Sequence, residues 1–571
     1  MNIRQLLDQR LTAALHAAGA PESSSAIIKL STRPEFGDYQ ANGVMAAAKQ
    51  LKMNPRELAA KVLEQADLSD LAEKIEIAGP GFLNIHLKTE WLAAALPSNT
   101  QLDPVTPQTV VVDYSSPNLA KEMHVGHLRS TIIGDAVVRV LEFQGHQVIR
   151  QNHVGDWGTQ FGMLLAHMAD LKAQGGELSM QLADLETFYR ESKQRFDADP
   201  AFAERSREYV VKLQSGDPEC LALWQQFIDI SLTHCEAAYQ ELGVSLTRKD
   251  VMAESAYNDD LANVVSDLQT QHLLTESDGA QCAFMDEFKN KEGSITPLII
   301  QKTGGGYLYA TTDLAAIRYR NKVLNADRVL YFVDVRQSLH FQQVYTLARK
   351  AGFAPATMSL EHMAFGTMLG EDGKPFKTRT GGTVKLSDLL EEAKERAYRF
   401  VSQRNPELSE IERREIAHVV GIGGVKYSDL SKNRTSDYVF SWDLILSLNG
   451  NTATYLQYAY ARIRSVIRKS GADIDQIPID LSHPIERSLG MKLLQFNEVI
   501  ESVGREGEPH HLCSYLYEVA GDAMSFYEEC PILKAEVPAE VRASRLQLAK
   551  LSADTLKTGL GLLGIGALER M

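Results

Sequence analysis

Residues 109–152 show a hydrophobic pattern that predicts a strand, a helix and a second strand. Residues 110–112 are three consecutive valines, typical of a strand that is buried on both faces. After a polar loop, apolar residues recur between residues 128 and 141 at the spacing of one helix face, and residues 147–152 again have strand character. Such a unit predicts a parallel sheet, with ligand chemistry at the carboxyl ends of its strands.

The remaining chain divides into regions with different patterns. A second strand–helix–strand unit is expected within residues 328–365. The two halves of the predicted sheet are therefore separated in the sequence by a long intervening segment. At about 150 residues per domain, the length of 571 residues predicts roughly four domains. We expect a multidomain α/β protein with a small α+β domain at 1–105, a Rossmann-type parallel-sheet domain at 106–385 with a helical insertion around 164–290, a helical linker at 386–445 and an all-α bundle at 446–571.

Composition and charge narrow the class of protein. With 44% hydrophobic and 23% charged residues, the chain matches ordinary globular usage. The net charge of −15 argues against nucleic-acid binding driven by overall charge, although basic stretches occur at 374–385 and 462–469. No apolar leader and no run of about 18 apolar residues occurs, so we expect a cytoplasmic protein without a membrane span. The five cysteines are scattered and form no C-x-x-C pair, which favours reduced thiols and no structural metal site.

His124, Val125, Gly126 and His127 form the sharpest local motif, where the polar loop opens the helix. With 15 histidines and 39 glycines in the chain, chance predicts only about 0.03 occurrences of H-x-G-H. A helix N-terminus presents free N–H groups to phosphates, glycine allows close approach of a base or ribose, and imidazoles can donate to phosphoryl oxygens. The alternative is a pair of histidines that merely cap the helix.

The strand, polar loop, H-x-G-H motif and helix together resemble the signature of class I aminoacyl-tRNA synthetases. Residues 113–130, 152–162 and 449–462 closely resemble bacterial arginyl-tRNA synthetases, and the similarity extends over essentially the whole chain. The resemblance implies that L-arginine and ATP, accompanied by Mg²⁺, form arginyl-adenylate and pyrophosphate. Arginine then passes to the terminal ribose of tRNA(Arg), without a covalent enzyme intermediate.

The resemblance also implies roles for residues around the nucleotide. The second signature of the class, a lysine-rich loop, matches residues 374–382 only in a degenerate form. In such enzymes the lysine before the first signature is thought to compensate, and that lysine is Lys121 here. The implied catalytic residues are Lys121, His124, His127, Lys377 and Arg379, and the implied ATP-binding residues are His124, Gly126, His127, Gly155, Asp156 and Trp157.

An arginine substrate must be recognised by acceptors, because a guanidinium carries five donors and no acceptor. Tyr309 and Asp313 are four residues apart, so a helix would turn both to the same side. Helical amphipathicity alone could also account for that spacing. The implied arginine-binding residues are Asp113, Ser115, Ser116, Asn118, Tyr309, Asp313 and Gln337.

Recognition of tRNA requires contacts with unstacked bases away from the sheet. The resemblance implies that the N-terminal domain reads a D-loop nucleotide, with Phe82 stacking on it and Asn84 pairing with its edge. It also implies that 386–445 contacts the tRNA stem and that the C-terminal bundle binds the anticodon through residues such as Tyr455, Tyr458 and Arg462. A core phenylalanine and a packed tyrosine stripe are the plainer interpretations.

Two other functions are compatible with the central motif. One is a nucleotidyltransferase that adenylylates a small molecule without RNA, and the other is an inactive tRNA-binding paralogue. The helical C-terminal third disfavours the first, and the intact residues of the motif disfavour the second. We expect a monomer that binds neither DNA nor membranes.

Overall fold

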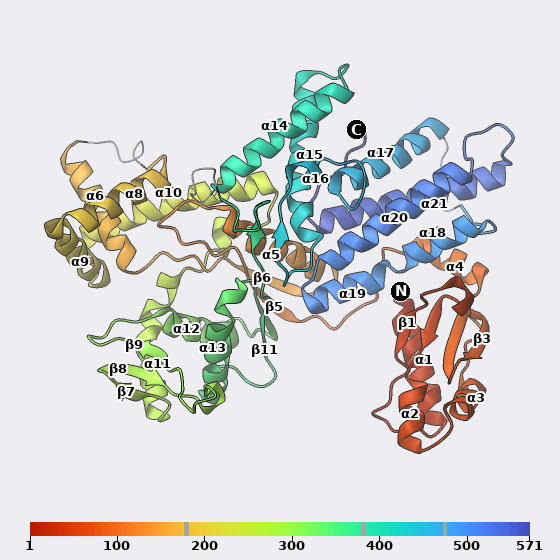
Figure 1. Cartoon of the computed structure of the whole chain (residues 1–571), viewed down its shortest axis with the longest axis horizontal. Coiled ribbons are helices and arrows are strands. Elements are labelled where there is room, and N and C mark those ends of the chain that lie inside the picture. Colours follow the sequence, from red (N-terminus) through yellow and green to blue (C-terminus); the bar gives the residue numbers. More distant parts are fainter. Residues whose placement is uncertain (176–181, 378–383, 472–476) are drawn as a thin grey trace.

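Four parallel strands form the central sheet in the order β11, β10, β5, β6 (Figure 1). The computed structural model describes residues 1–175, 182–377, 384–471 and 477–571. The two middle strands come from chain segments about two hundred residues apart, as the split pattern in the sequence predicts. The strands are β5 (Thr109–Asp113), β6 (Gln147–Gln151), β10 (Arg328–Tyr331) and β11 (Ser359–His362).

Helix α5 (Val125–Phe143) connects β5 to β6 and packs closely on the chain that leaves β5. Tyr114, which follows β5, is fully buried. A Cβ at Gly134 of α5 would lie 2.4 Å from the Cβ of Tyr114. The absence of a side chain at this position therefore sets how near the helix lies to the sheet.

The chain between β6 and β10 forms a helical insertion and a small antiparallel sheet (Figure 1). Asp199 and Asp217 cap two of the helices, each followed by a proline whose missing N–H costs nothing at a first helical position. The prediction of a mostly helical insertion is confirmed. The elements, with α13 after β10, are α6 (Thr159–Ala173), α8 (Leu185–Ala198), α9 (Pro200–Gln214), α10 (Pro218–Leu242), α11 (Asn258–Thr270), β7 (Thr275–Ser277), β8 (Ala280–Ala283), β9 (Leu298–Gln301), α12 (Tyr309–Lys322) and α13 (Ser338–Lys350).

The N-terminal domain is a four-stranded antiparallel sheet covered by helices, and it docks on the C-terminal helices (Figure 1). Both oxygens of Asp38 accept from the Arg487 guanidinium at 2.9 Å, and the Tyr39 hydroxyl donates to buried Glu498. These contacts fix the domain to the opposite end of the chain. Its elements are α1 (Ile3–Ala17), β1 (Ile28–Leu30), β2 (Tyr39–Ala41), α2 (Val44–Leu51), α3 (Pro55–Gln65), β3 (Ala72–Ala78), β4 (Phe82–Leu87) and α4 (Thr89–Ala95).

Among the described residues beyond 384, the regular elements are helices except for β13, which pairs with β12 of the preceding segment. Ser409 and Glu412 form a capping box at the start of α15, and left-handed Gly471 and Gly507 end α17 and α19. The expected helical third is confirmed. The elements are β12 (Met368–Leu369), α14 (Leu386–Arg404), α15 (Glu410–Leu430), β13 (Tyr438–Val439), α16 (Trp442–Ile445), α17 (Ala453–Ser470), α18 (Pro484–Leu494), α19 (Phe496–Glu506), α20 (His510–Glu529) and α21 (Ala539–Leu562).

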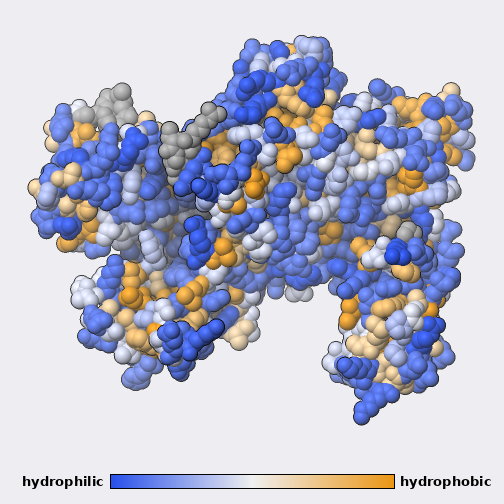
Figure 2. Space-filling model, viewed as in Figure 1, coloured by the Kyte–Doolittle hydropathy of each residue, from blue (hydrophilic) through white to orange (hydrophobic). Residues whose placement is uncertain are grey.

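The surface is largely polar. Figure 2 shows apolar side chains in separate groups among hydrophilic ones on the viewed face. Within the described ranges, no helix has the length and apolar character needed to cross a bilayer.

Replacing Gly134 by alanine should lower the thermal stability of the protein. An added methyl group must displace the buried Tyr114 ring, and overpacking of this kind costs about 1–3 kcal/mol. Gly521 of α20 is a matched control, because a Cβ there meets no atom within 4 Å. Gly521→Ala should instead stabilise by up to about 1 kcal/mol. Thermal unfolding of both variants checks the difference, and equal stabilisation by both would contradict the close packing of α5.

Candidate active site

The turn that follows β5 has an uncommon backbone conformation. Ser115 and Ser116 both have positive φ angles, 67° and 46°, which non-glycine residues rarely adopt. The amide of Ser115 donates to Ser130 and the amide of Ser116 donates to the side chain of Asn152, both at 2.9 Å. The Ser116 hydroxyl donates to Asp113 and accepts from the amide of His153. These bonds hold the chain in a conformation that it would otherwise leave.

His124 and His127 both cap the N-terminus of α5, each through the Nδ1 atom of its own ring. Nδ1 of His124 accepts from the Gly126 amide at 3.0 Å, and Nδ1 of His127 accepts from the His124 amide at 3.1 Å. Burial lowers the pKa of both rings, to about 3 for His127, with smaller contributions from Lys121 at His124 and from His124 at His127. Both imidazoles are therefore neutral at neutral pH. Because Nδ1 accepts a hydrogen bond in each ring, the proton is assigned to Nε2. Each ring therefore caps the helix with Nδ1, and its Nε2–H takes no part in the cap.

A cavity of about 550 Å³ lies at this helix N-terminus. His124, Gly126, His127 and Lys377 are among the residues that line it. It therefore combines two imidazole donors and a lysine, which are groups that bind phosphates. The backbone amides of residues 124–127 are already hydrogen-bonded within the protein. Arg379, the other predicted loop cation, lies outside the described residues.

Lys121 does not line this cavity. Its ammonium lies 4.2 Å from the ring centroid of Tyr189 in α8, which belongs to the helical insertion. Lys385 reaches the same region and pairs with Glu122 and Asp184. The insertion thus contacts the chain directly before the H-x-G-H motif, and Lys121 would have to turn away from Tyr189 to reach a nucleotide.

A second cavity of about 370 Å³ adjoins the first, and Ser116, Val333 and Gln337 line both. It brings together six of the seven residues predicted to bind arginine. Tyr309 and Asp313 lie one turn apart in α12, as their spacing predicts. The six are Asp113, Ser116, Asn118, Tyr309, Asp313 and Gln337.

Ser115 is the exception among the seven. It lines the first cavity, at the N-terminus of α5, instead of the second. The residue is 5% exposed, and its hydroxyl is hydrogen-bonded to Tyr239 and Thr131. The left-handed turn therefore places these neighbouring serines in different surroundings, and a contact of Ser115 with arginine stays a prediction.

Asp113 reaches the second cavity with its charge already paired. Oδ2 accepts from Arg320 at 2.7 Å, and this guanidinium is fully buried. Oδ1 accepts from the Ser116 hydroxyl at 2.8 Å. A buried arginine of the protein itself thus pairs with the carboxylate that is predicted to contact the substrate. In this structure both oxygens of Asp113 are hydrogen-bonded, and the bond from Ser116 stabilises the turn.

Glu254 is an acid of the second cavity that sequence reasoning missed. Burial, with contributions from Asp313 and Asp156, raises its pKa to about 8. Asp313 itself is hydrogen-bonded to His340 Nε2 at 2.6 Å. The carboxyl groups of Glu254 and Asp313 in this cavity could therefore both bind a guanidinium. No sequence spacing marks Glu254, since it lies in a short 3-10 turn between helices.

The predicted nucleotide wall at residues 155–157 is placed differently. Gly155 lines the second cavity and not the first cavity at the N-terminus of α5. Asp156 is 2% exposed and accepts from the amide and hydroxyl of Ser255, and Trp157 packs edge-on against Trp224 with ring centroids 5.7 Å apart. Asp156 and Trp157 thus line neither cavity and pack in the region around Glu254, and their contact with ATP stays a prediction.

The predicted tRNA contacts lie in the two outer domains. Phe82 is half-buried, whereas Asn84 is 3% exposed and its Oδ1 accepts from the amide of Gln40. Gln40 is the more exposed side-chain amide of this pair, and base pairing by Asn84 stays a prediction. In the C-terminal bundle Tyr458 and Arg462 line a cavity of about 1120 Å³ with Arg468, Lys469 and Tyr527. Tyr455 does not line it and packs against Tyr517.

Comparisons with known proteins agree with this architecture. Residues 92–442 match the model of "tRNA synthetases class I (R), catalytic domain", residues 2–87 match "Arginyl tRNA synthetase N terminal domain" and residues 456–571 match "DALR anticodon binding domain". The chain is 64% identical over 579 residues to the arginine–tRNA ligase of a Marinomonas species and 65% identical over 581 residues to that of Hahella chejuensis, with full coverage of all chains.

Solved structures give the same result. The arginyl-tRNA synthetase of Plasmodium falciparum superposes with a TM-score of 0.85 at 30% identity over 100% of this chain and 99% of its own. The Thermus thermophilus enzyme superposes with a TM-score of 0.84 at 26% identity over the whole of both chains. The parallel sheet and the histidine-capped helix are those of a class I aminoacyl-tRNA synthetase. Within that class, the chain belongs to the arginyl-tRNA synthetase family.

Arginine binding should strengthen as the pH rises toward 8. Glu254 is protonated at neutral pH in the empty cavity, and a bound guanidinium favours its ionised form, so binding releases a proton. The dissociation constant measured by calorimetry should fall about tenfold from pH 6 to pH 7 and level off above pH 8. Glu254→Gln should abolish this slope. A slope that persists in Glu254→Gln would exclude Glu254 as the source of the released proton.

Proposed function

We propose that this protein is an arginine–tRNA ligase that activates L-arginine with ATP and charges tRNA(Arg). In the first step a carboxylate oxygen of arginine attacks the α-phosphorus, and the bond to pyrophosphate breaks. In the second step a hydroxyl of the terminal tRNA ribose attacks the carbonyl carbon and releases AMP. Neither step requires a covalent bond to the protein, so catalysis consists of positioning and charge stabilisation.

The observation that carries this proposal is the pair of adjoining cavities. One has the donors suited to phosphates, the other has acidic and amide groups suited to a guanidinium, and Ser116, Val333 and Gln337 line both. An aminoacyl-adenylate joins an amino acid to a nucleotide through one phosphate. We place that phosphate at the shared border, with the adenosine at the N-terminus of α5 and the arginine side chain toward α12.

In this arrangement His124 and His127 stabilise the transferring phosphoryl group. The Nε2–H groups of both rings donate to its oxygens, while the backbone bonds to Nδ1 fix the rings in advance. Lys377 and Arg379 neutralise charge on the departing pyrophosphate, and Lys121 joins them after it leaves Tyr189. Mg²⁺ accompanies the ATP through its phosphates.

The arginine side chain lies between the carboxylates of Asp313 and Glu254. Tyr309 lies one helical turn before Asp313 and covers the guanidinium, and Asn118 and Gln337 bind polar atoms near the α-carbon. Two acids at one end of the cavity select a fixed cation with several donors over neutral amino acids.

We propose that tRNA is bound from both sides of the catalytic domain. Phe82 with Gln40 offers a stacking ring and a side-chain amide in the N-terminal domain. In the C-terminal cavity Tyr458 offers a stacking ring and Arg462 a guanidinium. The helical region at 386–445 contacts the stem between them. Because one chain supplies both cavities and both outer domains, we infer a monomer, and its five buried free cysteines suit the reducing cytosol.

The experiment that tests this function is ATP-dependent charging of total deacylated bacterial tRNA with each of the twenty amino acids separately. Labelling by arginine alone supports the proposal. Labelling by another amino acid would refute the assignment of the second cavity. Pyrophosphate exchange with an amino acid but no tRNA labelling would favour the RNA-free nucleotidyltransferase, and tRNA binding without either reaction would favour an inactive paralogue.

Two substitutions of His127 separate its donor from its capping role. Asparagine places an acceptor near the position of Nδ1 and preserves the cap, whereas glutamine places an amide donor near the position of Nε2. His127→Asn should reduce adenylate formation about 100-fold or more, as loss of a transition-state donor does, and His127→Gln should lose much less. Pyrophosphate exchange measures both, with circular dichroism as the folding control. Near-normal turnover of His127→Asn would refute the donor role.

A further inference from the structure

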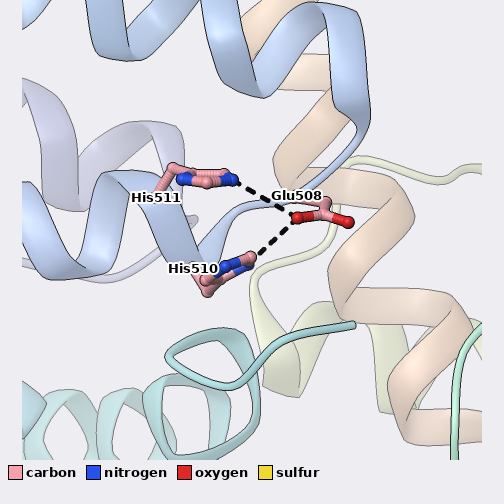
Figure 3. A group of neighbouring side chains, drawn as sticks. All are labelled: Glu508, His510 and His511. Atoms are coloured by element: carbon pink, nitrogen blue, oxygen red, sulfur yellow. Dashed lines mark ion pairs between the residues drawn. The ribbon is translucent and has the colours of Figure 1, made fainter. Parts of the chain in front are cut away.

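The short connection between α19 and α20, together with the start of α20, gathers three side chains that can ligate a metal. Glu508, His510 and His511 follow left-handed Gly507, and His510 is the first residue of α20. Figure 3 shows both imidazoles directed toward the carboxylate of Glu508. One ligand atom from each residue lies within 4.8 Å of the other two.

The distances suit a single ion. Nε2 of His511 and Nδ1 of His510 lie 3.3 and 3.7 Å from the same oxygen of Glu508, Oε2. Ligand atoms about 2.1 Å from a tetrahedral zinc ion are separated by about 3.4 Å. The three atoms are therefore close to the separations that a shared ion would impose.

His510 provides a second, independent observation. Its Nδ1 is buried and has no hydrogen-bond partner among the described residues, since 3.7 Å from Glu508 is too long for one. Buried ring nitrogens normally find a partner. An ion bound between this nitrogen and Oε2 of Glu508 would satisfy both atoms.

The connection is anchored to the catalytic domain before any ion binds. Buried Arg434 donates to the carbonyl oxygens of Gly507, Glu506 and Ala364. Arg434 also lies 3.9 Å from Oε1 of Glu508, which leaves Oε2 to the histidines. A Cβ at Gly507 would lie 2.9 Å from the sulfur of Met363, so the connection lies tightly against that domain.

We propose that Glu508, His510 and His511 form a binding site for a divalent first-row transition-metal ion such as Zn²⁺. Two imidazole nitrogens and one carboxylate are ligands that Zn²⁺ accepts in tetrahedral geometry, with a fourth position left for water. Mg²⁺ prefers an all-oxygen shell and competes poorly for them. Glu506, whose Oε2 lies 3.4 Å from Nε2 of His511, adds negative charge beside the site.

The competing interpretation is that these groups form ordinary ion pairs. His418 and Glu241 show such a pair elsewhere in the chain, with 3.5 Å between Nδ1 and the carboxylate. Because that pair lacks a second histidine, it provides a matched control for the experiment.

The test is calorimetric titration of the full-length, chelator-stripped protein with Zn²⁺ in a buffer containing excess Mg²⁺. The wild-type protein should bind one ion at a site that His510→Ala and His511→Ala each weaken at least about tenfold, because even an outer-shell partner of a metal contributes that much. His418→Ala should leave this binding unchanged. Thermal unfolding gives a second readout, since Zn²⁺ should raise the unfolding temperature of the wild-type protein and of His418→Ala but not of His510→Ala/His511→Ala.

Three outcomes would overturn the proposal. They are the absence of binding to the wild-type protein, displacement of the bound Zn²⁺ by the excess Mg²⁺, and binding that survives in His510→Ala/His511→Ala. Circular dichroism separates loss of the site from loss of the fold. Tetrahedral Co²⁺ absorption in the wild-type protein that His511→Ala removes would support the same ligand set spectroscopically.

Discussion

Two consecutive left-handed residues after β5, Ser115 and Ser116, fix how the two cavities meet. The turn is held by hydrogen bonds to Ser130 of α5 and to Asn152 directly after β6, and by Asp113, which is paired with buried Arg320. Ser116 lines both cavities, while Ser115 faces only one. The backbone conformation costs about 1–3 kcal/mol per residue where it is unsupported, so the surrounding hydrogen bonds must hold it. The border where we place the reacting phosphate depends on this turn.

Buried charges connect this region to the rest of the chain. Arg129 of α5 pairs with Asp429 of α15, and both side chains are nearly inaccessible. The same guanidinium donates to the carbonyl oxygen of Ser436 and lies over the ring of Tyr438. Removal of one partner from such a pair costs about 3–5 kcal/mol, because the other charge remains desolvated. The helix that carries the histidines is thus tied to the helical region beyond the sheet.

Hydrogen bonds and ion pairs of partly or fully buried charged side chains also hold the outer domains relative to each other. The N-terminal domain contacts α18 and α19 through Arg487 and Glu498, and Arg328 of β10 donates to the carbonyl oxygens of Gly504 and Arg505 at the end of α19. Helix α19 therefore contacts both the first domain and the central sheet. Such an arrangement fixes the spacing of the two outer domains through which we propose that tRNA is bound.

The sequence by itself determined the elements and the central motif. Three valines, a polar loop and a periodic helix encode β5 and α5, and the four-residue spacing of Tyr309 and Asp313 places them together, because local periodicity depends on few neighbours. Only the tertiary structure decided which polar groups are free. It paired Asp113 with Arg320, buried Asp156 and Asn84, and added Glu254, whose raised pKa arises from desolvation. Burial and partner choice depend on residues far apart in the chain, so no local pattern records them.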